Sequence, residues 1–295
     1  MTYYVIYRLG YGNGLNSILS GFLGHIHICE SKGSVPVIDM RNHPSIYTES
    51  QPILGTTNMW EYYFEPLNKV TLEEAYASAH WLDSEGRYPS EVMESLVYGT
   101  PWLLDTFDRN IRLRSETEAA LNISRARLGV SRKLLGVHFR GTDMRTTAGH
   151  PMPPTEEQLF KRVDMALNNN DFEKIFLVSE HQDYVKAFER RYGARLTYMD
   201  GPRKGATNSI AITSEAGDRY RLGLEVLLET LLLSECGGLI SGYSGLSEMS
   251  RVLSRGEYRV SDQVWNGRLR GGRLGSKYLW DYRSSAPRFL GGFKP

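Results

Sequence analysis

The sequence predicts an α/β fold of two facing Rossmann-like domains with a cleft between them. Three observations lead to this prediction. The chain has 295 residues, which is enough for two domains of ordinary size. In each half, segments rich in β-branched and aromatic residues alternate with segments whose apolar residues recur at helical intervals. Glycine-rich turns follow several of the predicted strands, and this alternation is typical of parallel sheets that bind ligands at the carboxyl ends of their strands.

The first 45 residues predict a βαβ unit. Residues 3–9 form a strand, the turn "GYGNG" at 10–14 follows it, residues 15–32 form a helix, and residues 35–40 form a second strand. Residues 46–115 are rich in aromatic and turn residues, so we expect short helices and loops there.

Residues 115–129 predict a helix that closes the first domain. Ser115 is expected to be its N-cap, with Glu118 completing a capping box, and Gly129 is expected to end it. The chain is therefore predicted to divide into an N-terminal domain, a C-terminal domain and a Gly/Arg-rich basic tail, at 1–130, 131–265 and 266–295. The tail is interpreted either as a solvated terminus or as a basic contact to an anionic ligand.

The second half alternates more regularly. Its predicted strands are at 133–139, 173–180, 195–200 and 237–242. Its predicted helices are at 155–170, 181–193, 218–236 and 245–254. Thr155 with Glu157 and Gln158 predicts an N-cap, and Gly193 predicts a helix end.

Composition excludes several classes of protein. A formal net charge of +1 gives no general attraction to nucleic acid, so no nucleic-acid partner is expected. The longest apolar run, 222–233, is interrupted by Glu225 and Glu229 and is too short for an integral membrane segment. Without a signal peptide, and with Cys29 and Cys236 read as buried free thiols, we expect a cytoplasmic protein.

The segment "LLGVHFRGTDMR", residues 134–145, carries the most informative polar residues. His138 and Arg140 are two positions apart on a predicted strand, so they face the same side and suit one common ligand. Arg140 is expected at the carboxyl edge of the sheet, where a guanidinium binds phosphate, although a structural ion pair is the alternative interpretation. Asp143 is expected to pair with Arg140 or Arg145, or to cap the loop.

Two glycine-containing turns are further candidate sites. Ser241, Ser244 and Gly245 come between a strand and a helix, which predicts either an anion site at a helix N-terminus or ordinary capping. Gly12 and Asn13 lie in the first turn and are candidate cofactor contacts. The spacing there is G-x-G-x-G rather than the dinucleotide pattern G-x-G-x-x-G, so a nicotinamide or flavin oxidoreductase, with Asp39 on the ribose, is kept as an alternative.

No metal or bound cofactor is expected, because the sequence contains no D-x-D, Cys-x-x-Cys or H-E-x-x-H pattern. It also contains no G-x-S-x-G elbow of a serine hydrolase.

Three ordered segments, "GVHFRGTDM", "FLVSE" and "LEVLLETLLLSECGGLISGYSGLSEMSRVL", resemble the motifs of the GDP-fucose-dependent fucosyltransferase superfamily. The α1,6-fucosyltransferases, both the rhizobial nodulation enzymes and those acting on N-glycan cores, are the most similar branch. The resemblance implies a GT-B glycosyltransferase that inverts at the sugar, needs no metal, and moves fucose from GDP-fucose to a hydroxyl of a glycan acceptor. It implies that domain 1–130 is on the acceptor side and that domain 131–265 binds the nucleotide sugar.

The resemblance also implies roles for individual residues. Arg140 is expected to bind the β-phosphate of GDP, His138 to lie by the guanine, and Asp200 to contact the base. Ser244 is expected to contact the diphosphate, with Ser241 and Gly245 as neighbours.

The chain departs from the family pattern after Asp143. The lysine and glutamate associated with acceptor activation in the N-glycan enzymes are replaced by Met144 and Ala148. Asp143, His150 and Glu180 are therefore the candidate general bases, and the histidine is favoured on pKa grounds. The identity of the acceptor glycan stays open. A non-catalytic carbohydrate-binding relative of the fold is kept as an alternative function.

Overall fold

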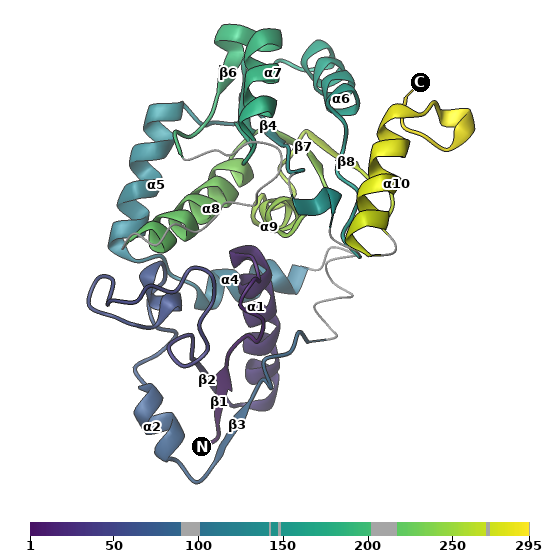
Figure 1. Cartoon of the computed structure of the whole chain (residues 1–295). Coiled ribbons are helices and arrows are strands. Elements are labelled where there is room, and N and C mark those ends of the chain that lie inside the picture. Colours follow the sequence, from purple (N-terminus) through teal and green to yellow (C-terminus); the bar gives the residue numbers. More distant parts are fainter. Residues whose placement is uncertain (90–100, 142, 147–148, 202–216, 270–271, 295) are drawn as a thin grey trace. The chain divides into compact units, whose positions relative to one another are not determined.

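The computed structural model describes residues 1–89, 101–141, 143–146, 149–201, 217–269 and 272–294 (Figure 1). The chain divides into two compact units. Unit 1 comprises Met1–Ile123 and Ile212–Leu228, and unit 2 comprises Ser124–Ala211 and Glu229–Pro295. The two units are described separately below.

Unit 1 is built on a parallel three-stranded sheet in the order β2-β1-β3. The strands are β1 (Tyr3–Ile6), β2 (Val35–Ile38) and β3 (Trp81–Asp83). The helices of this part of the chain are α1 (Leu15–Lys32), η1 (Met59–Tyr62), α2 (Leu72–Ala77), α4 (Pro101–Asn110) and α5 (Ser115–Leu128). The predicted βαβ unit is confirmed, because β1, α1 and β2 follow one another and β1 pairs with β2 in parallel.

Helix α1 is buried along much of its length, which explains its strongly apolar sequence. Leu19, Phe22, Leu23 and Ile26 are each at most 1% exposed. The helix ends at Gly33, whose φ of 65° is in the left-handed region that glycine adopts without strain.

Unit 2 contains a parallel five-stranded sheet in the order β6-β5-β4-β7-β8. Its strands are β4 (Leu134–His138), β5 (Lys174–Val178), β6 (Leu196–Thr197), β7 (Gly238–Gly242) and β8 (Val260–Val264). Its helical segments are η2 (Asp143–Arg145), α6 (Glu156–Asn169), α7 (Gln182–Tyr192), η3 (Gly193–Arg195), α9 (Gly245–Leu253), α10 (Arg273–Ser285) and η4 (Arg288–Leu290), and α8 (Asp218–Ser234) contributes residues to both units. In order of appearance the strands read 3-2-1-4-5, which is the order of a nucleotide-binding Rossmann sheet.

The two faces of this sheet are covered by different helices, as Figure 1 shows for α6 and α7 on one side and α8 and α9 on the other. Leu135, Val137 and Phe139 pack into the core formed with α6 and α7. On the opposite face, a Cβ added to Gly136 would lie 2.8 Å from Leu233 Cδ2 of α8. His138 has the same parity as Gly136, so it belongs to the face covered by α8 and α9.

Three local predictions differ from the structure. The short strand β3 lies where loops and helices were expected, and β8 and α10 were not anticipated. Ser115 is already helical rather than the N-cap, because Glu118 N–H donates to Arg114 O at 2.9 Å. The predicted stop at Gly129 is confirmed by its φ of 64°, and the predicted N-cap Thr155 is present, with Gln158 completing a capping box. Among the helices of the described ranges, none has the length and apolarity needed to cross a bilayer.

Candidate functional site at the carboxyl edge of the unit 2 sheet

The candidate site lies where the strand order of unit 2 reverses direction. From β4 the chain proceeds to β5 and β6 on one side, and then returns to β7 and β8 on the other. Open α/β sheets bind ligands outside the carboxyl ends of their strands at this switch point. His138, the last residue of β4, is paired in register with Ser241 of the neighbouring β7, so the two predicted segments meet here.

His138 and Ser244 form a buried polar pair at this edge. The imidazole is 4% exposed, and its Nδ1 lies 3.2 Å from Ser244 Oγ. Ser244 is also the N-cap of α9, where its Oγ accepts a hydrogen bond from Ser247 N–H at 3.1 Å. The serine hydroxyl therefore holds both the start of the helix and the ring, which confirms the capping interpretation and adds a link to His138.

Burial keeps His138 neutral. Burial, together with the positive charges of Arg140 and Arg251, lowers the pKa of His138 from 6.5 to about 3. In the tautomer in which Nδ1 accepts from Ser244 Oγ, Nε2 carries the proton, and His138 then offers a ligand a neutral N–H donor rather than a cation.

This depressed pKa makes stability depend on pH. Unfolding returns His138 to its ordinary pKa, so between pH 6.5 and 3 the unfolded chain binds one proton more than the folded chain. The contribution of neutral His138 to the free energy of unfolding is therefore complete above pH 6.5, and it is lost as the pH falls towards 3. Lowering the pH from 7 to 5 is expected to remove about 2 kcal/mol of the free energy of unfolding through this residue alone.

Urea unfolding at both pH values, compared between the wild type and His138→Asn, measures this contribution. The variant is expected to lose about 2 kcal/mol less than the wild type over this interval. Equal losses in the two proteins would show that His138 titrates normally in the folded state.

Arg140 and Glu180 follow neighbouring strands, β4 and β5, and approach each other at the sheet edge. Arg140 Nε lies 3.9 Å from Glu180 Oε1, and the side chains are 36% and 20% exposed. This distance is longer than a hydrogen bond, so the two charges attract each other without a directed bond between these atoms. The guanidinium is thus held next to a carboxylate and still reaches solvent.

His138, Arg140 and Ser244 line one small cavity. The other lining residues are Met144, Pro153, Pro154, Gly242 and Tyr243. The structure therefore brings together three of the residues that the resemblance assigned to one GDP-sugar. The cavity has no room for a water-sized molecule, so it shows where the three side chains meet rather than a preformed ligand site.

Arg251 is a site residue that sequence reasoning missed. Its Nη2 donates to Ser241 Oγ at 2.8 Å, and its Nη1 pairs with Glu248 Oε1 at 2.9 Å. Burial raises the pKa of Glu248. The charge of Arg251 and a hydrogen bond from Gln263 partly offset this rise. The spacing of Glu248 and Arg251, three residues apart on a helix, was the available signal.

A second missed group packs under the loop after β4. His181 caps α7, since its Nδ1 accepts from Asp183 N–H at 3.1 Å, and its ring stacks on Tyr184 with 4.5 Å between centroids. Tyr184 in turn stacks on Phe139 at 3.6 Å, and Arg145 lies 5.5 Å above the Tyr184 ring. These stacked side chains fix the chain on either side of Arg140.

Asp200 and His150, two further predicted residues of unit 2, do not line this cavity. Asp200 follows β6, is 81% exposed, and pairs with Arg127 Nη1 at 2.8 Å. The backbone oxygen of His150 accepts from Leu269 N–H at 2.9 Å, in a segment that runs beside residues 267–269. Asp143 lies in η2, but its side chain, like Ala148, falls outside the described residues. The sequence predicted all of these residues near the carboxyl edge of the sheet, but it could not show which loops fold toward the cavity at that edge.

Gly12 and Asn13 lie in unit 1, and the structure gives Asn13 a local role. Its Nδ2 donates to Leu9 O at 2.8 Å and to Gly10 O at 2.7 Å, which closes the turn before α1. Asp39 is fully buried, and its carboxylate accepts hydrogen bonds from Arg41 N–H, Asn42 and Tyr76. Burial alone would raise the pKa of Asp39, but the hydrogen bonds from Asn42 and Tyr76 outweigh it and lower the pKa. A carboxylate occupied in this way has little capacity for the ribose contact that the oxidoreductase alternative requires.

Within the described ranges, no group of three or more His, Cys, Asp or Glu side chains is placed to hold a metal ion. The positive charge at the candidate site comes from the guanidinium groups of Arg140 and Arg251.

Comparison by sequence finds no matching family model and no matching curated protein. Comparison by structure does find matches. The NodZ α1,6-fucosyltransferase soaked with GDP-fucose aligns with a TM-score of 0.56 at 17% identity, covering 86% of this chain and 93% of that one. The same enzyme co-crystallised with GDP gives a TM-score of 0.57 at 17% identity, with 86% and 93% covered, and fucosyltransferase NodZ from Bradyrhizobium gives 0.56 at 16%, with 86% and 94% covered. The predicted GT-B class of α/β fold is thereby confirmed.

Proposed function

We propose, from this shared fold and from the residues gathered at the switch point of unit 2, that the chain is a glycosyltransferase acting on GDP-fucose. It transfers fucose to a hydroxyl of a glycan acceptor, as an α1,6-fucosyltransferase does. The transfer inverts the configuration at the sugar carbon and proceeds without a metal.

The arrangement of His138, Arg140 and Ser244 is the observation that carries the proposal. These three residues come from β4 and from the turn after β7, and they line one cavity at the carboxyl edge. A neutral N–H donor, a guanidinium and a helix N-terminus together suit a base edge and a diphosphate. The solved NodZ structures with GDP and GDP-fucose have this fold, which supports the same donor here.

The chemistry assigns a role to each group. Breaking the bond between fucose C1 and the diphosphate oxygen leaves negative charge on GDP and positive character on the sugar ring. Arg140 stabilises the leaving diphosphate, and the first N–H groups of α9, beginning at Gly245, add further donors. Glu180, beside Arg140, is the candidate whose carboxylate can take the proton of the attacking hydroxyl.

A thermal-shift series with GDP, UDP, ADP and NAD tests the donor class. GDP at 100 times its dissociation constant is expected to stabilise the protein by about 2.7 kcal/mol, with smaller shifts for the other nucleotides. Turnover of GDP-fucose is expected to be the same with and without EDTA. A shift with NAD alone would favour the oxidoreductase alternative, and no shift with any nucleotide would favour a non-catalytic carbohydrate-binding protein.

Two helix caps of unit 2 provide a matched pair of variants. Ser244→Ala and Thr155→Ala each remove an N-cap, so each is expected to cost about 1 kcal/mol in the free energy of unfolding. Only Ser244→Ala also removes the partner of His138, so only this variant is expected to weaken GDP binding, by about tenfold. Urea unfolding and GDP titration measure the two effects, and equal GDP affinity in both variants would contradict the assigned site.

A further inference from the structure

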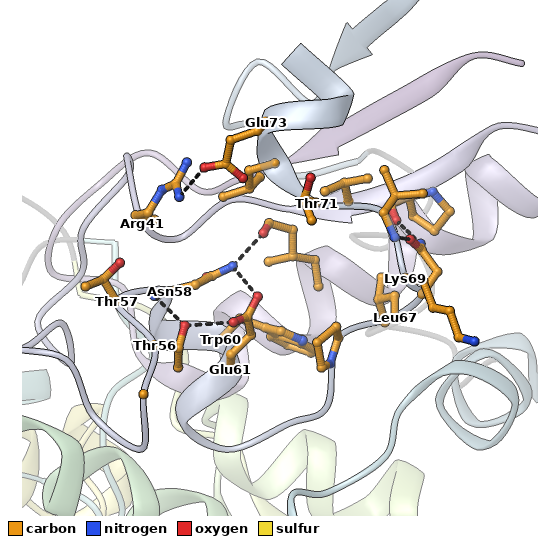
Figure 2. A pocket seen from close by; sticks show the side chains of 18 residues that line it. Arg41, Thr56, Thr57, Asn58, Trp60, Glu61, Leu67, Lys69, Thr71 and Glu73 are labelled. Carbon is orange, nitrogen blue, oxygen red and sulfur yellow. Dashed lines mark hydrogen bonds and ion pairs between the residues drawn. The ribbon is translucent and has the colours of Figure 1, made fainter. Parts of the chain in front are cut away.

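A second cavity lies entirely within unit 1, and Figure 2 shows it from close by. Its volume of about 810 Å³ is within the range of sites that bind small molecules. The buried part of its lining is mostly apolar, with Val37, Ile38 and Leu72 each at most 8% exposed. Polar and charged side chains form the walls and the rim.

The cavity borders β2, an edge strand of the unit 1 sheet, whose outer backbone groups are already paired. Asn58 acts like a neighbouring peptide group: its Nδ2 donates to Ile38 O at 2.8 Å, and its Oδ1 accepts from Met40 N–H at 3.1 Å. Asn68 Nδ2 donates to Pro36 O at 2.7 Å. These contacts disfavour an added peptide strand as the occupant, since the carbonyls that it would pair with are taken.

A fixed carboxylate stands on one wall. Glu61 accepts from Thr56 Oγ1 at 2.7 Å and from Asn58 Nδ2 at 3.0 Å, and these bonds are drawn in Figure 2. Asn58 is 4% exposed, so the carboxylate is held by a buried partner and needs little further ordering. An ionised carboxylate accepts about four hydrogen bonds, so Glu61 has capacity for ligand hydroxyls.

The charges on the lining are balanced. Arg41 and Glu73 form a pair at 2.7 Å on the opposite wall, and Lys69 and Glu61 are the other charged lining residues. Two cations and two carboxylates leave no net charge to attract a phosphate or a free carboxylate. Donors and acceptors around an apolar base instead suit a neutral ligand with many hydroxyls and an apolar face.

Trp60 supplies an independent sign of a missing partner. The residue lines the cavity and is 2% exposed, and its Nε1–H is buried without a hydrogen-bond acceptor among the described residues. Buried indole N–H groups usually find a partner.

We propose that this cavity is a saccharide-binding subsite that takes one ring of a neutral glycan. Glu61 and Arg41 bind hydroxyls of that ring, and the surface of Val37, Ile38 and Leu72 packs against its apolar face. Identification of this glycan with the acceptor rests on the proposed function.

Binding of neutral oligosaccharides to the full chain tests the proposal directly. Saturation-transfer NMR is run with trisaccharides of glucose, galactose and N-acetylglucosamine, without nucleotide. Glu61→Gln removes the charge at the same side-chain size, and Thr57→Trp fills the cavity from its exposed rim. Glu65→Gln is the matched control, because Glu65 is exposed four residues away and does not line the cavity.

At least one trisaccharide is expected to bind. Its dissociation constant is expected to be about tenfold larger in Glu61→Gln and unchanged in Glu65→Gln. Thr57→Trp is expected to abolish binding while the thermal shift caused by GDP stays as in the wild type. Absence of binding by all three trisaccharides, or wild-type binding in Glu61→Gln and Thr57→Trp, would overturn the subsite. Saccharide binding that depends on Glu61 in a protein that does not respond to GDP would leave the subsite standing and refute the proposed transferase instead.

Discussion

Arg140→Ala is expected to reduce kcat/KM for GDP-fucose by roughly 10²–10³-fold, or about 2.7–4 kcal/mol in the transition state. The guanidinium is the positive group at the carboxyl edge that faces both the cavity and solvent, so its loss removes the main stabilisation of the leaving diphosphate. The side chain is 36% exposed and its ion pair with Glu180 is longer than a hydrogen bond, so the fold is expected to survive. Initial rates of GDP release, together with a thermal melt of the variant, measure the two quantities.

Arg191→Ala is the matched control for Arg140→Ala. Arg191 is also a partly exposed, ion-paired arginine of unit 2, but its partner is Asp164 on α6. The activity of Arg191→Ala is expected to equal that of the wild type. Arg140→Lys keeps the charge without the bidentate fork and is expected to fall between the wild type and Arg140→Ala. A folded Arg140→Ala variant with wild-type turnover would remove Arg140 from the mechanism.

Glu180→Gln is expected to lower kcat by about 10²–10⁴-fold, because an amide cannot accept the proton of the attacking hydroxyl. Affinity for GDP is expected to change little, since the glutamine keeps the size of the side chain. Stopped assays of fucose transfer at saturating GDP-fucose measure kcat, and a GDP titration of the variant measures the affinity.

His150→Gln and Glu173→Gln separate the possible explanations of that result. Glu173 is an exposed glutamate at the other end of β5, paired with Lys133, and its replacement is expected to leave kcat unchanged. His150 was favoured by pKa considerations, but it does not line the described cavity. A large loss of kcat in His150→Gln with normal turnover in Glu180→Gln would assign the base to the histidine.

Local sequence was sufficient to predict the elements that have strong hydrophobic periodicity or clear signals at their ends. The helix from Gln182 to Tyr192 and the capping box at Thr155 follow from apolar spacing and side-chain chemistry that act within one helical turn. The alternating order of strands and helices was sufficient to predict two parallel sheets. The parity of His138 and Arg140 likewise indicated that they lie on one side of the sheet, and the structure places both on the lining of one cavity.

Short or polar elements could not be predicted because their stability comes from distant partners. β3 has three residues, of which Trp81 and Leu82 are exposed, and it is a strand only because it pairs with β1. β8, with the sequence VSDQV, pairs with β7 and has little apolar character of its own. Helix α10 is anchored through Trp280, which packs with Met152 and Phe293 at the end of the chain.

By itself, the sequence determined the α/β class, the cycle of strands and helices, and the polar residues that end β4 and β7, because each depends on contacts between residues near one another in the chain. Only the tertiary structure decided which of those residues meet. The strand order placed β4 beside β7 and joined His138 to Ser244 across 106 positions of sequence, whereas Asp200 paired with Arg127 instead. Pairing between distant segments depends on the packing of the whole sheet, which no local pattern encodes.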